Sequence, residues 1–325
     1  MKIHFRSIKN RIARPLHVFG QLTAGLPRGA GRVVMSGLGA VARAVYFLPN
    51  SHLRRTVGNF CNVTGRSDKW PLFSTMISNV EWSALHFVRL YRYGRTELLA
   101  QTAIDPGIEA QLRRLNSSKK GALILVPHCA GAVLSSARLS TVSPTVLLVR
   151  EPKDPARCQL LLEYLKKLGP EFILTRNTSP ALVIRQIVRA LKDGKVVVGT
   201  TDPLLKPEDP EAIRAEAFGQ PIYSPVWPAR LSARLGAPII PGFIHMQKGK
   251  ITLLADEGYL EEDIHQCTQR WVSSFEKFFR QHPSDWLFML DKNWARVLAT
   301  AAESPKRAPV SDRNYQDPFI SGQRT

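Results

Sequence analysis

The chain has 325 residues, of which 44% are hydrophobic and 22% are charged, and its formal net charge is +19. This length allows one large domain or two small ones, and the composition excludes a disordered, collagen-like or disulfide-built protein. So strong a positive charge attracts anions, which leaves three classes of partner: nucleic acid, anionic lipid headgroups and acidic carrier proteins.

The positive charge is concentrated at the N-terminus. No Asp or Glu precedes Asp68, so more than half of the net charge lies in the first fifth of the chain. A localised basic segment of this kind is typical of a docking element. Its basic residues are Lys2, Arg6, Lys9, Arg11, Arg14, Arg28, Arg32, Arg43, Arg54, Arg55 and Arg66.

Residues 33–48 form an apolar run that contains Ser36 and Arg43 as its polar members. As a helix the run would rise about 24 Å, short of the roughly 30 Å of a bilayer core. It therefore either spans the membrane, with Arg43 reaching the interface, or lies along the surface. An ordinary buried helix is the alternative. A cleaved signal peptide is disfavoured, because the basic region is too long and no small-residue cleavage site follows promptly.

Upstream of this run, apolar residues recur at near-helical spacing among the basic ones, which suits a helix on anionic headgroups. These apolar residues are Phe5, Ile8, Ile12, Leu16 and Phe19. We therefore predict that residues 1–67 form a basic membrane-associating segment, with its charged flank in the cytoplasm.

From residue 68 onward, short apolar runs alternate with helical patterns. The runs typical of buried strands are residues 122–126, 146–149, 172–174, 196–198, 239–244 and 251–254. The predicted helices are residues 71–93, 154–169, 179–194, 224–236, 260–280 and 286–298. This order predicts an α/β fold with a central, mostly parallel or mixed sheet flanked by helices. We place this domain at residues 68–298 and a polar disordered tail at residues 299–325.

Three of the predicted helices begin with a side-chain oxygen followed by proline, at Asp154, Ser179 and Ser224, and end near glycine. Such oxygens cap free amide groups, and proline fits the first turn.

The four cysteines are Cys61, Cys129, Cys158 and Cys267, and they show no paired spacing. We therefore expect reduced thiols, without a disulfide framework or a zinc site, which favours the cytoplasmic side of a membrane.

One histidine stands out after common motifs are excluded. The chain contains no P-loop, no GxGxxG after a strand, no HExxH and no GxSxG. His128 follows the predicted strand 122–126 and precedes small residues, where open α/β sheets place their active crevice. An imidazole there can take a proton from an attacking hydroxyl, although a purely structural histidine is an equal alternative. His245, His265 and His282 are isolated in sequence, so we expect surface or capping roles for them.

Two charged residues follow other predicted strands. Arg150 follows the strand at residues 146–149, and Asp202 follows residues 196–201. If these strands run parallel, both residues converge with His128 at one edge of the sheet.

At this point the chain resembles the lipid A biosynthesis (lauroyl/myristoyl) acyltransferases of the lysophospholipid acyltransferase superfamily, from about residue 47 to 298. After the basic N-terminus and the strand with its histidine, the blocks that carry the resemblance are LLVREPKDP, LTRNTS, DGKVVVGTTDP, AFGQPIYSPVWPARLSARLGAPIIPGFI and HPSDWLFMLDKNW. The resemblance implies a glycerolipid acyltransferase-like fold at the cytoplasmic face of a bacterial inner membrane. It also implies a monomer that binds anionic lipids and no nucleic acid.

The resemblance further implies a mechanism. His128 would deprotonate a lipid hydroxyl, which attacks the thioester of an acyl carrier protein or coenzyme A. No metal or other cofactor is implied. Arg150 and backbone amides would stabilise the oxyanion, and Asp202 matches the family's acidic residue after the DGKVVV strand. The substrate-binding residues implied are Arg176, Phe218, Gly219, Arg230 and Arg234. Of these, Arg230 and Arg234 lie one turn apart and either face one phosphate or are two solvated side chains.

The chain departs from the family at one position. The family signature is His, four residues, then Asp or Glu, whereas here the sequence reads His128-Cys-Ala-Gly-Ala-Val133. Loss of an orienting acid costs about 10⁴ in rate in hydrolase triads. Either another acid serves, with Asp202 first and Glu151 second, or the protein is a catalytically silent lipid-binding relative. The acceptor stays open among lipid A precursors, glycerophospholipids, amino-acid lipids and polyene-type pigments.

Overall fold

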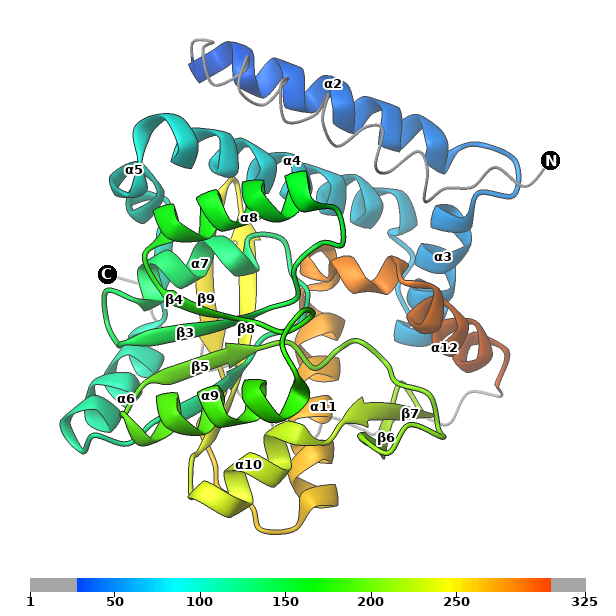
Figure 1. The fold of residues 1–325 in the computed structure, drawn as a ribbon. Coiled ribbons are helices and arrows are strands. Elements are labelled where there is room, and N and C mark those ends of the chain that lie inside the picture. The colour runs from blue at the N-terminus through cyan, green and yellow to red at the C-terminus, as the bar shows by residue number, and fades with distance from the viewer. Residues whose placement is uncertain (1–27, 305–325) are drawn as a thin grey trace, which may run out of the picture.

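The fold, a computed structural model that describes residues 28–304, is built around a seven-stranded sheet with the order β1-β9-β8-β2-β5-β3-β4 (Figure 1). Its strands are β1 (Thr102–Ile104), β2 (Ala122–Leu125), β3 (Thr145–Val149), β4 (Glu171–Leu174), β5 (Val196–Gly199), β8 (Ile239–Gln247) and β9 (Lys250–Ala255). Every neighbouring pair is parallel except β8 and β9, which form an antiparallel hairpin. The predicted α/β fold with a mostly parallel sheet is confirmed.

Helices flank this sheet. They are α2 (Arg28–Tyr46), α3 (His52–Thr64), α4 (Lys69–Tyr93), α5 (Arg95–Ala100), α6 (Pro106–Ser117), α7 (Ala132–Leu139), α8 (Pro155–Leu168), α9 (Pro180–Lys192), α10 (Trp227–Leu235), α11 (Ile264–Gln281) and α12 (Lys292–Glu303), with short 3₁₀ turns η1 (Pro283–Asp285) and η2 (Leu287–Leu290). The central strands β2 and β5 are buried on both faces, which is why they read as continuous apolar runs.

Two of the predicted helix starts are confirmed by their capping contacts. The Asp154 carboxylate accepts a hydrogen bond from the backbone N–H of Arg157 (2.9 Å), and the Ser179 hydroxyl accepts one from that of Leu182 (3.4 Å). The third start is wrong. Ser224 lies on a strand and is buried, and α10 begins at Trp227 without a side-chain cap.

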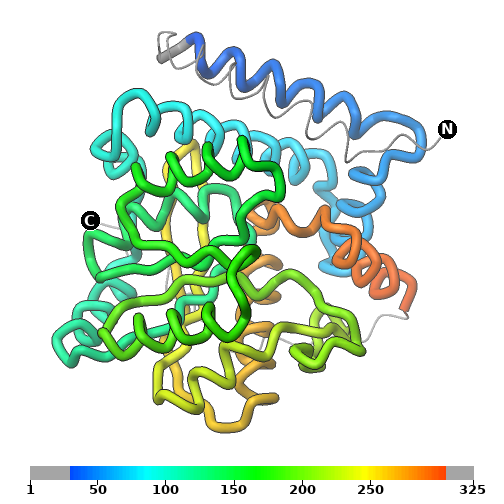
Figure 2. The backbone as a smooth tube through the Cα atoms, in the orientation of Figure 1, coloured from blue at the N-terminus to red at the C-terminus, as the bar shows by residue number. Residues whose placement is uncertain are grey.

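A separate antiparallel hairpin, β6 (Ala212–Ala217) and β7 (Gln220–Pro225), is an element that the sequence pattern missed. Its first strand alternates buried and exposed residues over only six positions, so it does not form an apolar run. The hairpin packs against α11, and Figure 2 shows it beside the C-terminal helices, away from the main sheet.

The packing also extends across both predicted domain boundaries. Val57 and Phe60 of α3 are fully buried in the main core, although they precede residue 68, because α3 packs against α12 and η2. Helix α12 runs to Glu303, past the predicted boundary at residue 298. Asp291 caps the start of this helix, and its side chains Trp294 and Leu298 are buried. The rest of the predicted tail, from residue 305, lies outside the described residues, as do residues 1–27.

Helix α2 lies across one side of the molecule, alongside α4 (Figures 1 and 2). Its Arg43 guanidinium donates to the Ser78 hydroxyl (2.8 Å) and pairs with the Glu81 carboxylate (2.5 Å). On the opposite side of α2, Val33 and Val41 are 73% and 64% exposed. Among the helices of residues 28–304, none combines the length and the apolar character that a bilayer-crossing segment needs.

Candidate active site

The candidate site lies where β2 and β5 end side by side. The two strands are parallel, with Leu125 paired to Gly199. Because His128 and Asp202 each lie three residues after the end of their strand, they meet at the carboxyl edge of the sheet. Both carboxylate oxygens of Asp202 contact the histidine: Oδ1 lies 2.6 Å from the ring Nδ1, and Oδ2 accepts from the backbone N–H at 2.9 Å.

The two members of this pair differ in exposure. The Asp202 side chain is 2% exposed and the His128 side chain is 38% exposed. A buried carboxylate that accepts from Nδ1–H fixes the tautomer of the ring. The Nε2 nitrogen of that tautomer has a lone pair that can accept a proton.

A segment about 160 residues further along the chain also contacts this pair. The ring of Phe288 stacks on the imidazole of His128, with 3.9 Å between ring centroids and 14° between planes. The indole N–H of Trp294 donates to the backbone carbonyl of Asp202 (2.6 Å). The N–H of Leu287 donates to the carbonyl of His128 (3.0 Å). The sequence shows these residues only as an aromatic-rich block, with no signal that assigns them to His128.

The loop after His128 has no room for a side chain at Gly131. Its cysteine, Cys129, is not a second nucleophile. Gly131 has a φ of +79°, and a Cβ there would lie 3.0 Å from the Met246 methyl group. Burial, with the nearby negative charges of Asp285 and Asp202, raises the pKa of the Cys129 thiol. That thiol therefore stays protonated and poorly nucleophilic near neutral pH.

The position of the family's motif acid carries no carboxylate in the fold either. Val133 lies in the first turn of α7 and is 42% exposed. Asp202, the first alternative acid suggested by the sequence, is the carboxylate that contacts the histidine.

The second alternative, Glu151, is engaged elsewhere. Its carboxylate is fully buried and accepts from the backbone N–H groups of Arg176 (3.0 Å) and Asn177 (2.7 Å). Burial alone would raise the pKa of Glu151, but these backbone donors outweigh it and hold the pKa below its ordinary value. The carboxylate thus stays ionised and fixes the loop after β4, which lies three strands from β2. Glu151 is therefore wrong as a replacement acid.

The two arginines at neighbouring strand ends are placed at the same edge of the sheet but make different contacts. Arg150 follows β3, two strands from β2, and its side chain is exposed. Within residues 28–304 it has no hydrogen bond or ion pair with His128 or Asp202. Arg176 follows β4, and its Nε–H donates to the carbonyl of Glu151 (2.5 Å).

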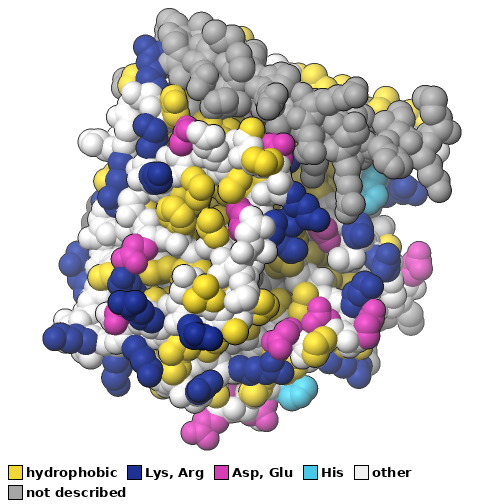
Figure 3. Space-filling view, viewed as in Figure 1, with side chains coloured by type: hydrophobic (Ala, Val, Ile, Leu, Met, Phe, Trp, Pro, Cys, Tyr) yellow, Lys and Arg dark blue, Asp and Glu magenta, His cyan; other side chains and the backbone are white. Residues whose placement is uncertain are grey.

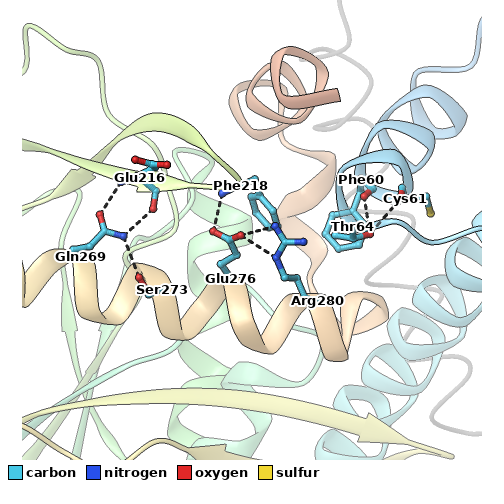
Figure 4. Close-up of polar contacts among 9 residues, drawn as sticks. All are labelled: Phe60, Cys61, Thr64, Glu216, Phe218, Gln269, Ser273, Glu276 and Arg280. Carbon is cyan, nitrogen blue, oxygen red and sulfur yellow. Dashed lines mark hydrogen bonds and ion pairs between the residues drawn. The ribbon is translucent and has the colours of Figure 1, made fainter. Parts of the chain in front are cut away.

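Phe218 and Gly219 form the tip of the β6–β7 hairpin, and Figure 4 shows how α11 holds it. The backbone N–H of Phe218, a residue with a φ of +53°, donates to the Glu276 carboxylate (2.7 Å), which also pairs with Arg280. The Phe218 ring is buried and stacks on Trp286 (5.9 Å). This ring thus belongs to the aromatic packing that supports the Trp286–Trp294 segment, while Gly219 is exposed.

The remaining predicted substrate residues lie on α10. The Arg230 guanidinium pairs with both oxygens of the Glu211 carboxylate (3.0 and 2.9 Å), and the Arg234 side chain is exposed. Helix α10 packs on β8 and α11. Arg230 thus already has an anionic partner within the chain.

Two histidines that look isolated in sequence meet in the fold. His245 Nδ1 lies 2.8 Å from Asp285 Oδ2, and the His282 ring lies 4.5 Å from that of His245. Possible ligand atoms of these three residues lie within 4.8 Å of one another. The expected capping role is confirmed for His282, which is the C-cap residue of α11. It is wrong for His245, which lies on β8 and contacts a buried carboxylate, because the turn at residues 282–285 folds back onto that strand. The sequence missed this cluster, since His245 is far along the chain from the other two members.

The sequence of this chain is similar to those of known proteins. Residues 3–296 match the model of the bacterial lipid A biosynthesis acyltransferase family. A region of 198 residues is 25% identical to the phosphatidylinositol mannoside acyltransferase of Mycobacterium tuberculosis (strain CDC 1551 / Oshkosh). That match covers 59% of this chain and 59% of the relative, so it spans less than two thirds of that protein.

Proposed function

Because the chain belongs to the bacterial lipid A biosynthesis acyltransferase family, we propose that it transfers a fatty acyl group from a thioester donor to a hydroxyl group of a membrane lipid, with His128 as the base. The observation that carries this proposal is the contact between His128 Nδ1 and the buried carboxylate of Asp202 (2.6 Å). It leaves Nε2 at a partly open surface and gives the protonated ring a negative partner.

The reaction follows from this geometry. Nε2 removes the proton of the acceptor hydroxyl as its oxygen attacks the thioester carbonyl carbon. A tetrahedral oxyanion forms, and the carbon–sulfur bond then breaks. The imidazolium returns its proton to the departing thiolate, so that an ester and a free thiol result. Asp202 stabilises the positively charged ring between these two steps and does not itself take the proton.

Arg150 is the proposed cation for the oxyanion or for a donor phosphate. It lies at the carboxyl edge of the sheet with its guanidinium exposed, and parallel strands bring that edge together with His128. Arg176 lies beside it at the end of β4, in a loop that the Glu151 carboxylate fixes. We propose that it contributes to the same substrate-binding region, with Phe218 and Gly219 supporting the site from the hairpin.

The donor and acceptor classes follow from charge and from the relatives. Lys and Arg side chains are spread widely over the face shown in Figure 3, which suits an acidic carrier protein or coenzyme A as the donor. The acceptor proposed is an anionic or glycosylated membrane lipid with a free hydroxyl group. The family's description names lipid A biosynthesis, and the mycobacterial relative is named for a phosphatidylinositol mannoside.

We propose that the protein works at the cytoplasmic surface of the inner membrane. The support is the basic, acid-free sequence of residues 1–67 together with the exposed apolar side chains of α2 and the turn after it. These are Val33, Leu38, Val41, Val45, Phe47 and Leu48. An amphipathic surface of this kind binds in the plane of the interface, with its apolar face at the headgroup–acyl boundary.

Substitution of the base tests the enzymatic proposal. The variant His128→Ala should reduce transfer of a labelled acyl group from acyl carrier protein or coenzyme A to extracted membrane lipid by at least about 10³-fold. His265→Ala is the matched control, because His265 is exposed on α11. Equal turnover of both variants with every donor would contradict the proposal. Complete inactivity of the wild-type chain would favour a lipid-binding relative without catalysis.

A further inference from the structure

The turn between β8 and β9 is fixed against α4. Its residues Lys248 and Gly249 both have positive φ, +49° and +85°, the conformation that two-residue hairpins favour. The carbonyl of Gly249 accepts a hydrogen bond from His86 Nε2 (2.6 Å), and a Cβ at Gly249 would lie 2.7 Å from the Trp82 ring. The close approach holds Lys248 beside α4.

A second cation faces the same stretch of α4 from α2. The Arg32 guanidinium lies over the Trp82 ring, 4.6 Å from its centroid. Because Arg43 ties α2 to Ser78 and Glu81, the helix that carries Arg32 is held in place. Two cations from distant parts of the chain thus lie near Trp82.

Between them lies a cavity of about 600 Å³, which is within the size range of sites for small ligands. Its polar lining consists mainly of Arg32, Ser74, Thr75, Ser78, Asn79 and Lys248. We name it the Arg32–Lys248 cavity. Two cations with the hydroxyl groups of Ser74, Thr75 and Ser78 form a set that suits a phosphate group, whereas the Asn79 amide already donates to Asp285.

Glu81 lines an adjoining pocket together with Arg32, but its carboxylate pairs with Arg43. The lining of the cavity contains no Asp or Glu, and within residues 28–304 no carboxylate pairs with Arg32 or Lys248. The chain before Asp68 has no acidic residue that could supply one. Because no carboxylate of residues 28–304 pairs with them, Arg32 and Lys248 are available to bind an anion.

The cavity is lined in part by α2, the helix that also carries exposed apolar side chains. Arg32 lines the cavity, and its neighbour Val33 is 73% exposed. A phospholipid has the same arrangement of groups, since its phosphate lies next to acyl chains at the depth of an interfacial helix. We propose that the Arg32–Lys248 cavity binds the phosphate of an anionic membrane phospholipid and so orients the protein on the bilayer. The inference rests on the proposed membrane-surface function, but this site is separate from His128.

Binding of a soluble lipid to the full chain tests the proposal. The probe is short-chain phosphatidic acid below its micelle concentration, measured by titration calorimetry, with short-chain phosphatidylcholine and inorganic phosphate as the comparison ligands. The double variant Arg32→Gln/Lys248→Asn removes both charges, and asparagine tolerates the positive φ of residue 248. We expect phosphatidic acid to bind this variant roughly 30-fold more weakly than the wild type.

The matched control is Arg54→Gln/Arg55→Gln, which removes two charges from exposed positions of α3. It should bind phosphatidic acid as the wild type does, and thermal unfolding should show that both double variants fold. Equal weakening in both variants would overturn the proposal in favour of general electrostatic attraction. Competition by inorganic phosphate as strong as that of the lipid would overturn it in favour of a free-phosphate site.

Failure of this site and failure of the proposed function are distinguishable. Acyl transfer in detergent micelles reports on His128 and should be unchanged by Arg32→Gln/Lys248→Asn. If wild-type protein binds phosphatidic acid but transfers no acyl group, the cavity stands and the catalytic proposal falls. If it transfers acyl groups but does not bind the soluble lipid, the cavity proposal falls.

Discussion

Within residues 28–304 the molecule contains two histidine–aspartate pairs, and they differ in what else the carboxylate holds. Asp202 contacts the ring and the backbone N–H of one residue, His128. Asp285 accepts from His245 Nδ1 (2.8 Å), from Asn79 Nδ2 (2.9 Å) and from the backbone N–H of Met246 (3.2 Å). One carboxylate serves a single histidine, whereas the other joins α4, β8 and η1.

The comparison shows that the chemistry of the two side chains does not define a site by itself. Asp202 leaves its histidine with a partly open ring at the carboxyl edge of parallel strands, where a substrate can approach. Asp285 is fully buried and accepts from three donors of two segments, α4 and β8, so its loss would leave buried donors without an acceptor. We therefore expect substitutions in the first pair to change catalysis and those in the second to change stability.

The largest effect is expected for Asp202→Asn. The amide no longer stabilises the protonated ring and favours the wrong tautomer, so kcat for acyl transfer should fall by about 10⁴-fold. Chemical denaturation should show that the variant stays folded. Asp193→Asn, at an exposed position after α9, is the control. A loss of less than tenfold would mean that Asp202 is not the acid that serves His128.

The second pair should respond in the opposite way. In Asp285→Asn, one oxygen that accepts hydrogen bonds becomes an N–H₂ group facing other donors. The free energy of unfolding in urea should fall by about 2–3 kcal/mol. Turnover per folded molecule should fall much less than in Asp202→Asn. A variant of unchanged stability would show that the three contacts of Asp285 add little to the fold.

A smaller effect is expected for the ring that covers the first histidine. Phe288→Leu removes the stacking on His128 but keeps apolar bulk, so kcat should fall by about 5- to 10-fold with little change in KM. Phe87→Leu is the control, because Phe87 packs on Tyr164 of α8, away from the pair. Equal kinetic constants for Phe288→Leu and the wild type would show that the stacking does not position the imidazole.

The smallest effect concerns a third histidine, His86, whose ring contacts a backbone carbonyl. Burial lowers the pKa of His86 from its ordinary value of 6.5, although its hydrogen bond to Gly249 opposes this. Below that ordinary value the unfolded chain binds a proton that the folded chain resists, so the free energy of unfolding should decrease as pH falls from about 7 to about 5. His86→Gln keeps a donor for Gly249 and should reduce this slope in denaturation curves. An unchanged slope would exclude His86 as its source.

The sequence by itself determined the alternation of strands and helices, because burial on both faces leaves continuous apolar runs such as residues 122–125. It also determined the capped starts of α8 and α9, since Asp154 and Ser179 act on amides within three residues. The place of His128 at a strand end follows from the same local pattern.

Tertiary structure alone decided which acid meets the histidine. Asp202 follows β5 and Glu151 follows β3, and of these two strands only β5 is hydrogen-bonded to β2. Strand order depends on contacts between distant segments. The same holds for Phe288, for the His245–Asp285 pair and for the meeting of Arg32 with Lys248. Each joins residues far apart in the chain, and local periodicity contains no information about such contacts.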